Sequence, residues 1–497
     1  MRSKAEKLWE LGLCLAVLAA VLLFFEKAHP LVILDADDWT YISQSRIALP
    51  SVRFWNPARI LPELLMPWAA GLGVLLFSRL GYIPAITAMN GLVLSLFITL
   101  YIRAFFRLLT DRLRLTPGRA APLALLFLLL HFSLFRTAPS QNTYLFWSKD
   151  VTCVYYYVIP GLLNCSLVML LVRTGLHRRF WEKKELWKKS LLLPAVYLAV
   201  FSNLFESAIL ACWCGLELLN ALLRLGKKRL APRDFWREQS FSLVLVLLWL
   251  LSALFEGLGG RGSIPSSLSF GAALGESVRQ GAGFFGGIYL LVWMLILGAG
   301  ALLLLTVLRK KPGEEQRQPL RELLLPLLLM GLLLLLFELL LCARVDPSYA
   351  RRSDVMFGVC FALLALTGLA LGLLLKRWER LLLLLPLVLL ILYSATDTRS
   401  RTFRDSNEML LPAELCTELD QTLVDQVLEA QARGESRVTL HVPDYGGGDN
   451  WPHALYLGDR MAASLFKHGL TRELMQIEIL PDPALNEQFG LPGGADA

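Results

Sequence analysis

Residues 8–34, LWELGLCLAVLAAVLLFFEKAHPLVIL, are apolar at almost every position. A helix needs about 20 such residues to cross the hydrocarbon layer of a bilayer, so this run is long enough to span a membrane. The basic start that precedes it (Arg2, Lys4, Lys7) is typical of a signal peptide, but the run is too long and lacks a small-residue cleavage site. We therefore predict a retained anchor.

The rest of the chain repeats this composition. Apolar residues make up 55% of the 497 positions and charged residues only 18%. This composition excludes a soluble enzyme, because a soluble domain could not bury so much apolar area. We predict an all-α polytopic membrane protein with about 11 transmembrane helices. The predicted crossings are 8–34, 83–104, 120–135, 155–173, 190–203, 205–223, 240–256, 288–308, 323–342, 355–375 and 381–395.

The net charge of +8 comes from Lys and Arg in short clusters between the apolar runs. Such spacing is typical of membrane topology and does not indicate a nucleic-acid partner. The positive-inside rule places the clusters and the N-terminus in the cytoplasm. Run 61–80 then has to be an outer-surface or re-entrant helix, because a crossing there would put the next cluster outside. The clusters lie within 103–119, 173–189, 224–237, 309–321 and 376–380.

The composition changes after residue 395. We expect a transmembrane domain over 1–395 and a small extracytoplasmic α/β domain over 396–497, large enough for a modest core. Period and composition predict a helix over 413–433, a strand over 437–442, a loop over 444–450, a helix over 454–468 and a strand over 475–480.

Three carboxylates, Asp35, Asp37 and Asp38, follow the first anchor directly. Close carboxylates repel, so such a cluster can hold a divalent cation or accept a proton from an attacking hydroxyl. A solvated helix end that stops the anchor from sliding explains the same residues. The neighbouring side chains favour a site for sugars and phosphates, because they combine aromatic faces with hydrogen-bonding groups: Trp39, Tyr41, Trp55, Asn56 and Arg59.

An anchor ending in an Asp-rich loop, many further spans and an external C-terminal domain resemble the GT-C class of integral membrane glycosyltransferases. Asp37-Asp38-Trp39, followed by Ala58-Arg59, is similar to the Asp-Asp-aromatic and Gly-Arg pattern of bacterial glucosyltransferases that decorate surface polysaccharides, with Ala58 where that pattern has Gly. Related membrane families of unknown activity share the pattern.

The resemblance implies a hexosyltransferase in the bacterial plasma membrane that takes its sugar from a polyprenyl-phosphate donor and passes it to an extracytoplasmic glycan. It implies Asp37 or Asp38 as the catalytic base and Asp35 as an orientation or metal partner. If a divalent cation (Mg or Mn) takes part, Asp35 and Asp38 are its expected ligands.

Negative charge develops on the lipid phosphate during transfer, so a cation has to meet it. Candidates are Arg59, Lys149, Arg344, Arg351 and Arg352. The arginines near Tyr349 stand in a predicted external loop, where anchoring to phospholipid head groups is the alternative. Glu206, at the tip of the hairpin 190–223, either faces a wet cavity or caps a turn.

Two other functions remain open. A transporter or flippase for a lipid-linked precursor would bury ionisable residues in its spans, whereas the charges here are expected to collect at loops. A non-catalytic envelope assembly protein would use 396–497 to bind its partner.

Overall fold

The computed structural model describes residues 3–33, 36–51, 55–135, 145–146, 151–182, 186–259, 268–309, 318–395, 413–444 and 457–490. Two residues of the predicted site, Asp35 and Lys149, lie outside these ranges.

The described part of the chain is dominated by helices, nine of which are long and apolar enough to cross a membrane. This confirms an all-α polytopic protein. The nine are α1 (Lys4–Leu23) with η1 (Phe24–Ala28), α3 (Ile60–Phe77) with η2 (Ser78–Leu80), α4 (Tyr82–Asp111), α6 (Val151–Cys153) with η3 (Val154–Val158) and α7 (Ile159–Thr174), α9 (Leu204–Gly226), α10 (Pro232–Leu258), α12 (Leu290–Arg309), η6 (Leu320–Leu324) with α14 (Leu325–Val345), and α15 (Phe357–Arg377).

The predicted count of about 11 stays a prediction. Three expected crossings, 120–135, 190–203 and 381–395, fall on helices shorter than these nine: α5 (Pro117–Ser133), α8 (Leu186–Val200), and η8 (Glu379–Leu384) with α16 (Leu385–Ala395). Conversely α3, which we did not count as a crossing, is among the nine by length and composition.

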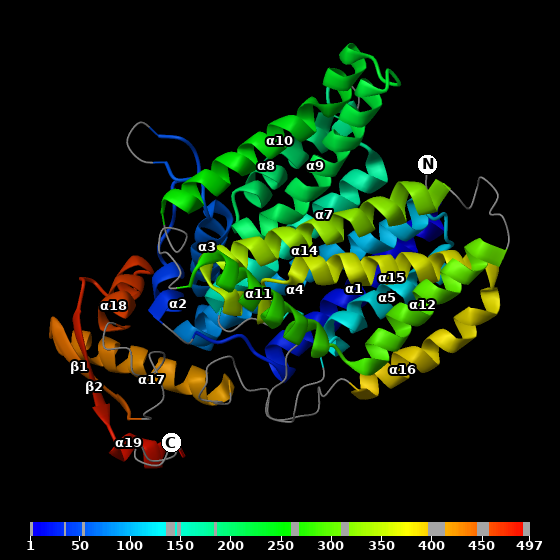
Figure 1. The fold of residues 1–497 in the computed structure, drawn as a ribbon. Helices are drawn as coiled ribbons and strands as arrows, with labels where there is room; N and C mark the ends of the chain where they lie inside the picture. The colour runs from blue at the N-terminus through cyan, green and yellow to red at the C-terminus, as the bar shows by residue number, and fades with distance from the viewer. Residues whose placement is uncertain are drawn as a thin grey trace.

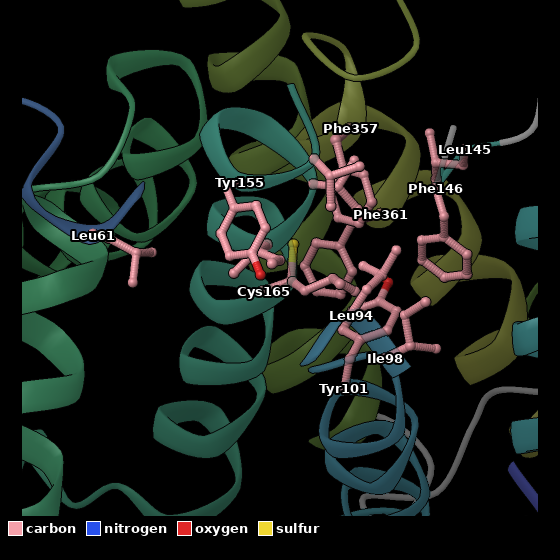
Figure 2. Packing of buried hydrophobic residues seen from close by; sticks show 14 of the residues in the cluster. Leu61, Leu94, Ile98, Tyr101, Leu145, Phe146, Tyr155, Cys165, Phe357 and Phe361 are labelled. Carbon is pink, nitrogen blue, oxygen red and sulfur yellow. The ribbon is translucent and has the colours of Figure 1, made fainter. Parts of the chain in front are cut away.

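The centre of the bundle is aromatic (Figure 2). Tyr101 of α4 lies among Phe357 and Phe361 of α15, with ring centroids 6.4 and 6.0 Å away, and its hydroxyl lies 3.0 Å from His131 Nε2 of α5. All of these side chains are buried. Most buried polar groups in proteins are hydrogen-bonded, and this pair satisfies both partners while the rings fill the space between helices.

Ion pairs bring the predicted basic clusters together at one end of the bundle, which we call the basic end: the start of α1, the ends of α4, α7 and α9, and the start of α14. Arg103 of α4 donates to Glu10 of α1 over 2.6 Å, and Arg112 donates to Glu322 over 3.1 Å. Arg173 of α7 donates over 3.0 Å to Asp111. Arg237 pairs with Glu182, and Arg119 pairs with Glu379. The five clusters therefore share one end, as the topology argument requires.

The opposite end, which we call the aspartate end, contains α2 (Ala36–Tyr41), the starts of α3, α4, α7 and α9, and the end of α14. Helix α3 lies obliquely across it. At about 27 Å long, α3 starts beside Tyr156 and ends in the turn that begins α4. Tyr155, the neighbour of Tyr156, donates a hydrogen bond to Asn90 of α4. Asn90 lies only about 12 Å along α4 from its first residue, Tyr82. Both ends of α3 therefore lie near the same end of the bundle.

Four tail elements match the predicted ones closely: α17 (Ala413–Ala432), β1 (Arg437–Pro443), α18 (Leu457–Lys467) and β2 (Gln476–Asp482). A short helix that was not predicted, α19 (Ala484–Gln488), follows β2. β1 and β2 pair in parallel, with Leu440 opposite Ile479. Figure 1 shows these elements beside α2 at the aspartate end, away from the N-terminus. The predicted loop 444–450 lies outside the described residues apart from Asp444.

The segment between the predicted crossings 240–256 and 288–308 contains a helix that we did not expect, α11 (Phe270–Gly286). Three of its four buried residues, Ala273, Ser277 and Gly281, follow at intervals of four, and the fourth is Phe284, so the buried residues form one face of the helix. Small residues on that face allow close packing against α14, where a Cβ at Gly281 would lie 3.2 Å from Leu339.

Candidate functional site

The two described aspartates of α2 have different surroundings. Asp38 is fully buried, and its Oδ1 accepts hydrogen bonds of 2.6 Å from both the backbone N–H and the hydroxyl of Thr152. The side chain of Asp37 is 60% exposed, and its Oδ1 lies 3.9 Å from Arg460 of α18. Asp38 therefore ties α2 to α6, while Asp37 remains accessible at the surface beside a cation.

Trp39 fixes the orientation of α2. It is fully buried and stacks on Tyr82 of α4 at a centroid distance of 6.4 Å. Its backbone carbonyl accepts a hydrogen bond from the hydroxyl of Ser464 in α18, and the Thr40 hydroxyl accepts one from Arg460. Trp39, predicted to contact substrate, is thus a packing residue, and α18 covers one side of α2.

The run Tyr155-Tyr156-Tyr157 lies in η3, a π-helical turn. Such turns occur frequently at functional sites. The Tyr156 hydroxyl donates to Glu63 of α3 over 3.0 Å, and Arg46 donates to the same carboxylate through two bonds of 2.6 Å. The ring of Tyr41, a predicted substrate contact, lies 5.3 Å from that of Tyr156. The run therefore joins α2, α3 and α7.

Arg59 begins α3 in a left-handed backbone conformation, with φ 63°, which is uncommon outside glycine. Its N–H donates to Ser202, and its guanidinium donates to Glu256 of α10 over 2.7 and 3.1 Å. Burial alone would lower the pKa of Arg59, but the bonds to Glu256 hold it above its usual range. Arg59 is therefore a charged residue that is already paired. Asn56, exposed, accepts from the N–H of Ala58 within a turn.

Arg352 is paired in the same way. Its guanidinium donates to Asp354 over 3.0 and 2.6 Å and lies 4.9 Å from the ring centroids of both Tyr157 and Tyr349, a cation–π arrangement. Burial would lower the pKa of Arg352, but the adjacent Asp354 keeps it above its usual range. Arg344 and Arg351 are exposed. Of the predicted arginines, these two are the ones with no ion pair among the described residues.

Two acidic side chains are buried inside the bundle. Glu206, in the first turn of α9, and Glu338, in the middle of α14, are fully buried and have no hydrogen-bond partner among the described residues. Glu206 packs against α7 so closely that a Cβ on Gly161 would lie 2.7 Å from its Oε2. The expectation that charges collect at loops is therefore wrong for Glu338.

The described residues contain no group of three or more His, Cys, Asp or Glu side chains that could hold a metal ion. Asp35, the expected partner of Asp38 in a metal site, lies outside them. Both protons offered by Thr152 point to Asp38, which gives Asp38 a structural role that needs no metal.

Several residues of this site were missed from the sequence: Glu63, Thr152, Glu256, Asp354 and Arg460. One feature of the sequence could have pointed to such buried acidic residues. Glu256 and Glu338 are each isolated carboxylates within apolar runs, where an acidic group is costly unless it has a function or a partner. Thr152 and Arg460 carry no comparable signal.

Comparison of the chain with family models, with curated proteins and with solved structures found no match.

Proposed function

We propose that the protein is a membrane glycosyltransferase that moves a hexose from a polyprenyl-phosphate donor to an extracytoplasmic glycan, with Asp37 as the catalytic base. The observation that carries this proposal is the difference in surroundings between Asp37 and Asp38 of α2. One carboxylate is buried and held by Thr152, and its neighbour is exposed beside Arg460. A base needs to reach the acceptor hydroxyl and to be held on a fixed support.

In this proposal the Asp37 carboxylate takes the proton of the acceptor hydroxyl while the hydroxyl oxygen bonds to the anomeric carbon of the donor. The bond from that carbon to the lipid phosphate oxygen breaks, and the phosphate leaves with the electron pair. Arg59 and Arg352 already donate to Glu256 and Asp354. Among the described residues, Arg344 and Arg351 are therefore the cations left to meet the phosphate, together with Arg460 beside Asp37. Lys149, outside the described residues, stays a candidate.

The oblique placement of α3 supports a lipid-borne donor. Its apolar side chains Trp68, Leu75 and Leu76 are 67%, 73% and 63% exposed, so α3 offers an apolar surface near the aspartate end. In the proposed topology α3 lies at the outer leaflet, the basic end faces the cytoplasm, and the tail elements form an extracytoplasmic domain of a protein in the bacterial plasma membrane.

The test is transfer of labelled glucose from polyprenyl-phosphate glucose to envelope glycan in membranes that contain each variant. Asp37→Asn is expected to lower the rate by about 10²- to 10⁴-fold, the usual contribution of a general base, without loss of folded protein. Asp38→Asn and Thr152→Val are expected to lower activity and thermal stability together. The matched control Asp459→Asn changes an exposed carboxylate of α18 and should leave transfer unchanged. Full activity of Asp37→Asn would refute the base assignment.

A transporter or flippase of a lipid-linked precursor is the second candidate, and the buried carboxylates Glu206 and Glu338 favour it. Ionisable residues inside membrane spans are costly and are typical of proton or substrate pathways. The same membranes separate the two functions. Movement of polyprenyl-phosphate glucose across the bilayer with no new glycosidic bond would support transport, whereas sugar transfer that depends on Asp37 would support the enzyme.

A further inference from the structure

A cavity of about 920 Å³ lies at the basic end, far from Asp37. It is formed by the ends of α7 and α9 and the start of α14, and α7 with its preceding turns separates it from Thr152 by about 30 Å. Five arginines contribute to its wall: Arg112, Arg178, Arg224, Arg229 and Arg321.

The cavity has an excess of positive charge. Only two carboxylates line it, and each is already engaged, Glu217 by Arg178 over 2.8 Å and Glu322 by Arg112 over 3.1 Å. The other three arginines, Arg224, Arg229 and Arg321, have no ion pair among the residues that the structure describes. Clustered arginines without carboxylates are suited to bind a phosphate group.

The other wall of the cavity is apolar and open to the side. Leu219 and Leu223 of α9 are 53% and 55% exposed, and Leu325 and Leu329 of α14 are 49% and 45% exposed. All four belong to apolar helices long enough to cross a membrane, so their exposed faces are positioned to meet lipid chains. A soluble anion would use the arginines and leave this wall uncovered.

Two polar groups in the wall also lack partners. Trp213 and His177 are 4% and 3% exposed, and neither Trp213 Nε1 nor His177 Nδ1 has a hydrogen-bond partner among the described residues. A buried polar group without a partner costs free energy comparable to a lost hydrogen bond, so an acceptor oxygen in the cavity would satisfy the Trp213 N–H.

We propose that this cavity binds an anionic phospholipid, with the phosphate at Arg224, Arg229 and Arg321 and an acyl chain along Leu219, Leu223, Leu325 and Leu329. Basic pockets between membrane helices recognise lipid head groups by this combination of charge and apolar surface. The site would couple the protein to the lipid composition of one leaflet. It does not depend on the transferase activity proposed above.

The experiment uses the purified full-length protein in nanodiscs of phosphatidylcholine containing a small fraction of spin-labelled phosphatidylglycerol, and measures the lipid fraction immobilised on the protein. The double variant Arg224→Gln/Arg229→Gln is expected to weaken specific binding of phosphatidylglycerol by at least about tenfold. The matched control Lys227→Gln/Arg233→Gln removes the same charge from exposed positions of the same cluster that do not line the cavity, and should change binding less than about twofold.

Equal weakening in the control would overturn the proposal, since it would show general attraction to the basic surface. Displacement of the lipid by inorganic phosphate at equal concentration would also overturn it, because the apolar wall would then contribute nothing. Thermal stability of both double variants in pure phosphatidylcholine verifies that the substitutions leave the fold intact.

Discussion

At the aspartate end, Arg59 and Arg352 each donate to a carboxylate and lie against a tyrosine ring, whereas at the basic end Arg224, Arg229 and Arg321 surround a cavity without an ion pair among the described residues. Breaking a paired, buried charge leaves an uncompensated ion, so such pairs hold elements in place. Unpaired arginines around a cavity instead leave room for an external anion. The comparison shows that an arginine predicted from sequence to bind phosphate is available for that role only where the fold does not already pair it with a carboxylate.

The largest effect expected at the aspartate end comes from removing the partner of Arg59. Glu256→Gln leaves Arg59 half-buried and unpaired in its left-handed conformation, and is expected to lower the free energy of unfolding by about 1–3 kcal/mol, measured by unfolding in a detergent titration. Glu276→Gln is the matched control, because its partner Arg279 is 75% exposed and such surface pairs contribute little. Equal effects of both variants would show that the Arg59–Glu256 pair does not hold α3 against α10.

A smaller effect concerns the contact between α18 and the bundle. His468 Nδ1 lies 2.8 Å from the Tyr82 hydroxyl, and burial lowers the pKa of His468. The docked state therefore prefers the neutral imidazole. The His468 contact stabilises docking fully above the ordinary histidine pKa of about 6.5. This stabilisation is lost as the pH falls through the lowered pKa of His468.

Hydrogen exchange of residues 457–467 measures this contact. We expect exchange of the α18 amides to accelerate as the pH falls below about 6.5, after correction for intrinsic rates, and His468→Phe to remove the pH dependence. An unchanged pH dependence in that variant would assign it to another group.

Much of this fold follows from patterns within single segments. The apolar runs predict the long helices because each is long enough to span a bilayer, and period and composition together predict α17, β1, α18 and β2. Helix α11 was missed because three of the four residues on its buried face are Ala, Ser and Gly, and one Phe among such small residues does not form an apolar stripe. Whether 396–497 forms a domain of its own remains a prediction.

The site is less predictable because its partners are distant in sequence. Arg59 and Glu256 are 197 positions apart, and Asp38 and Thr152 are 114 apart. A single sequence does not show which of several charges will meet. The sequence also could not distinguish the buried Asp38 from the exposed Asp37, because adjacent residues of a short helix point in different directions.

The measurement that tests the central claim most directly is the sidedness of the two ends. Single cysteines at exposed positions, Gln44→Cys beside α2 and Lys227→Cys at the basic end, are labelled with a membrane-impermeant maleimide in intact cells, with the parent chain and its own eight cysteines as the baseline. The account predicts labelling of position 44 in intact cells and of position 227 only after permeabilisation. Labelling of position 44 only after permeabilisation would contradict an extracytoplasmic aspartate end.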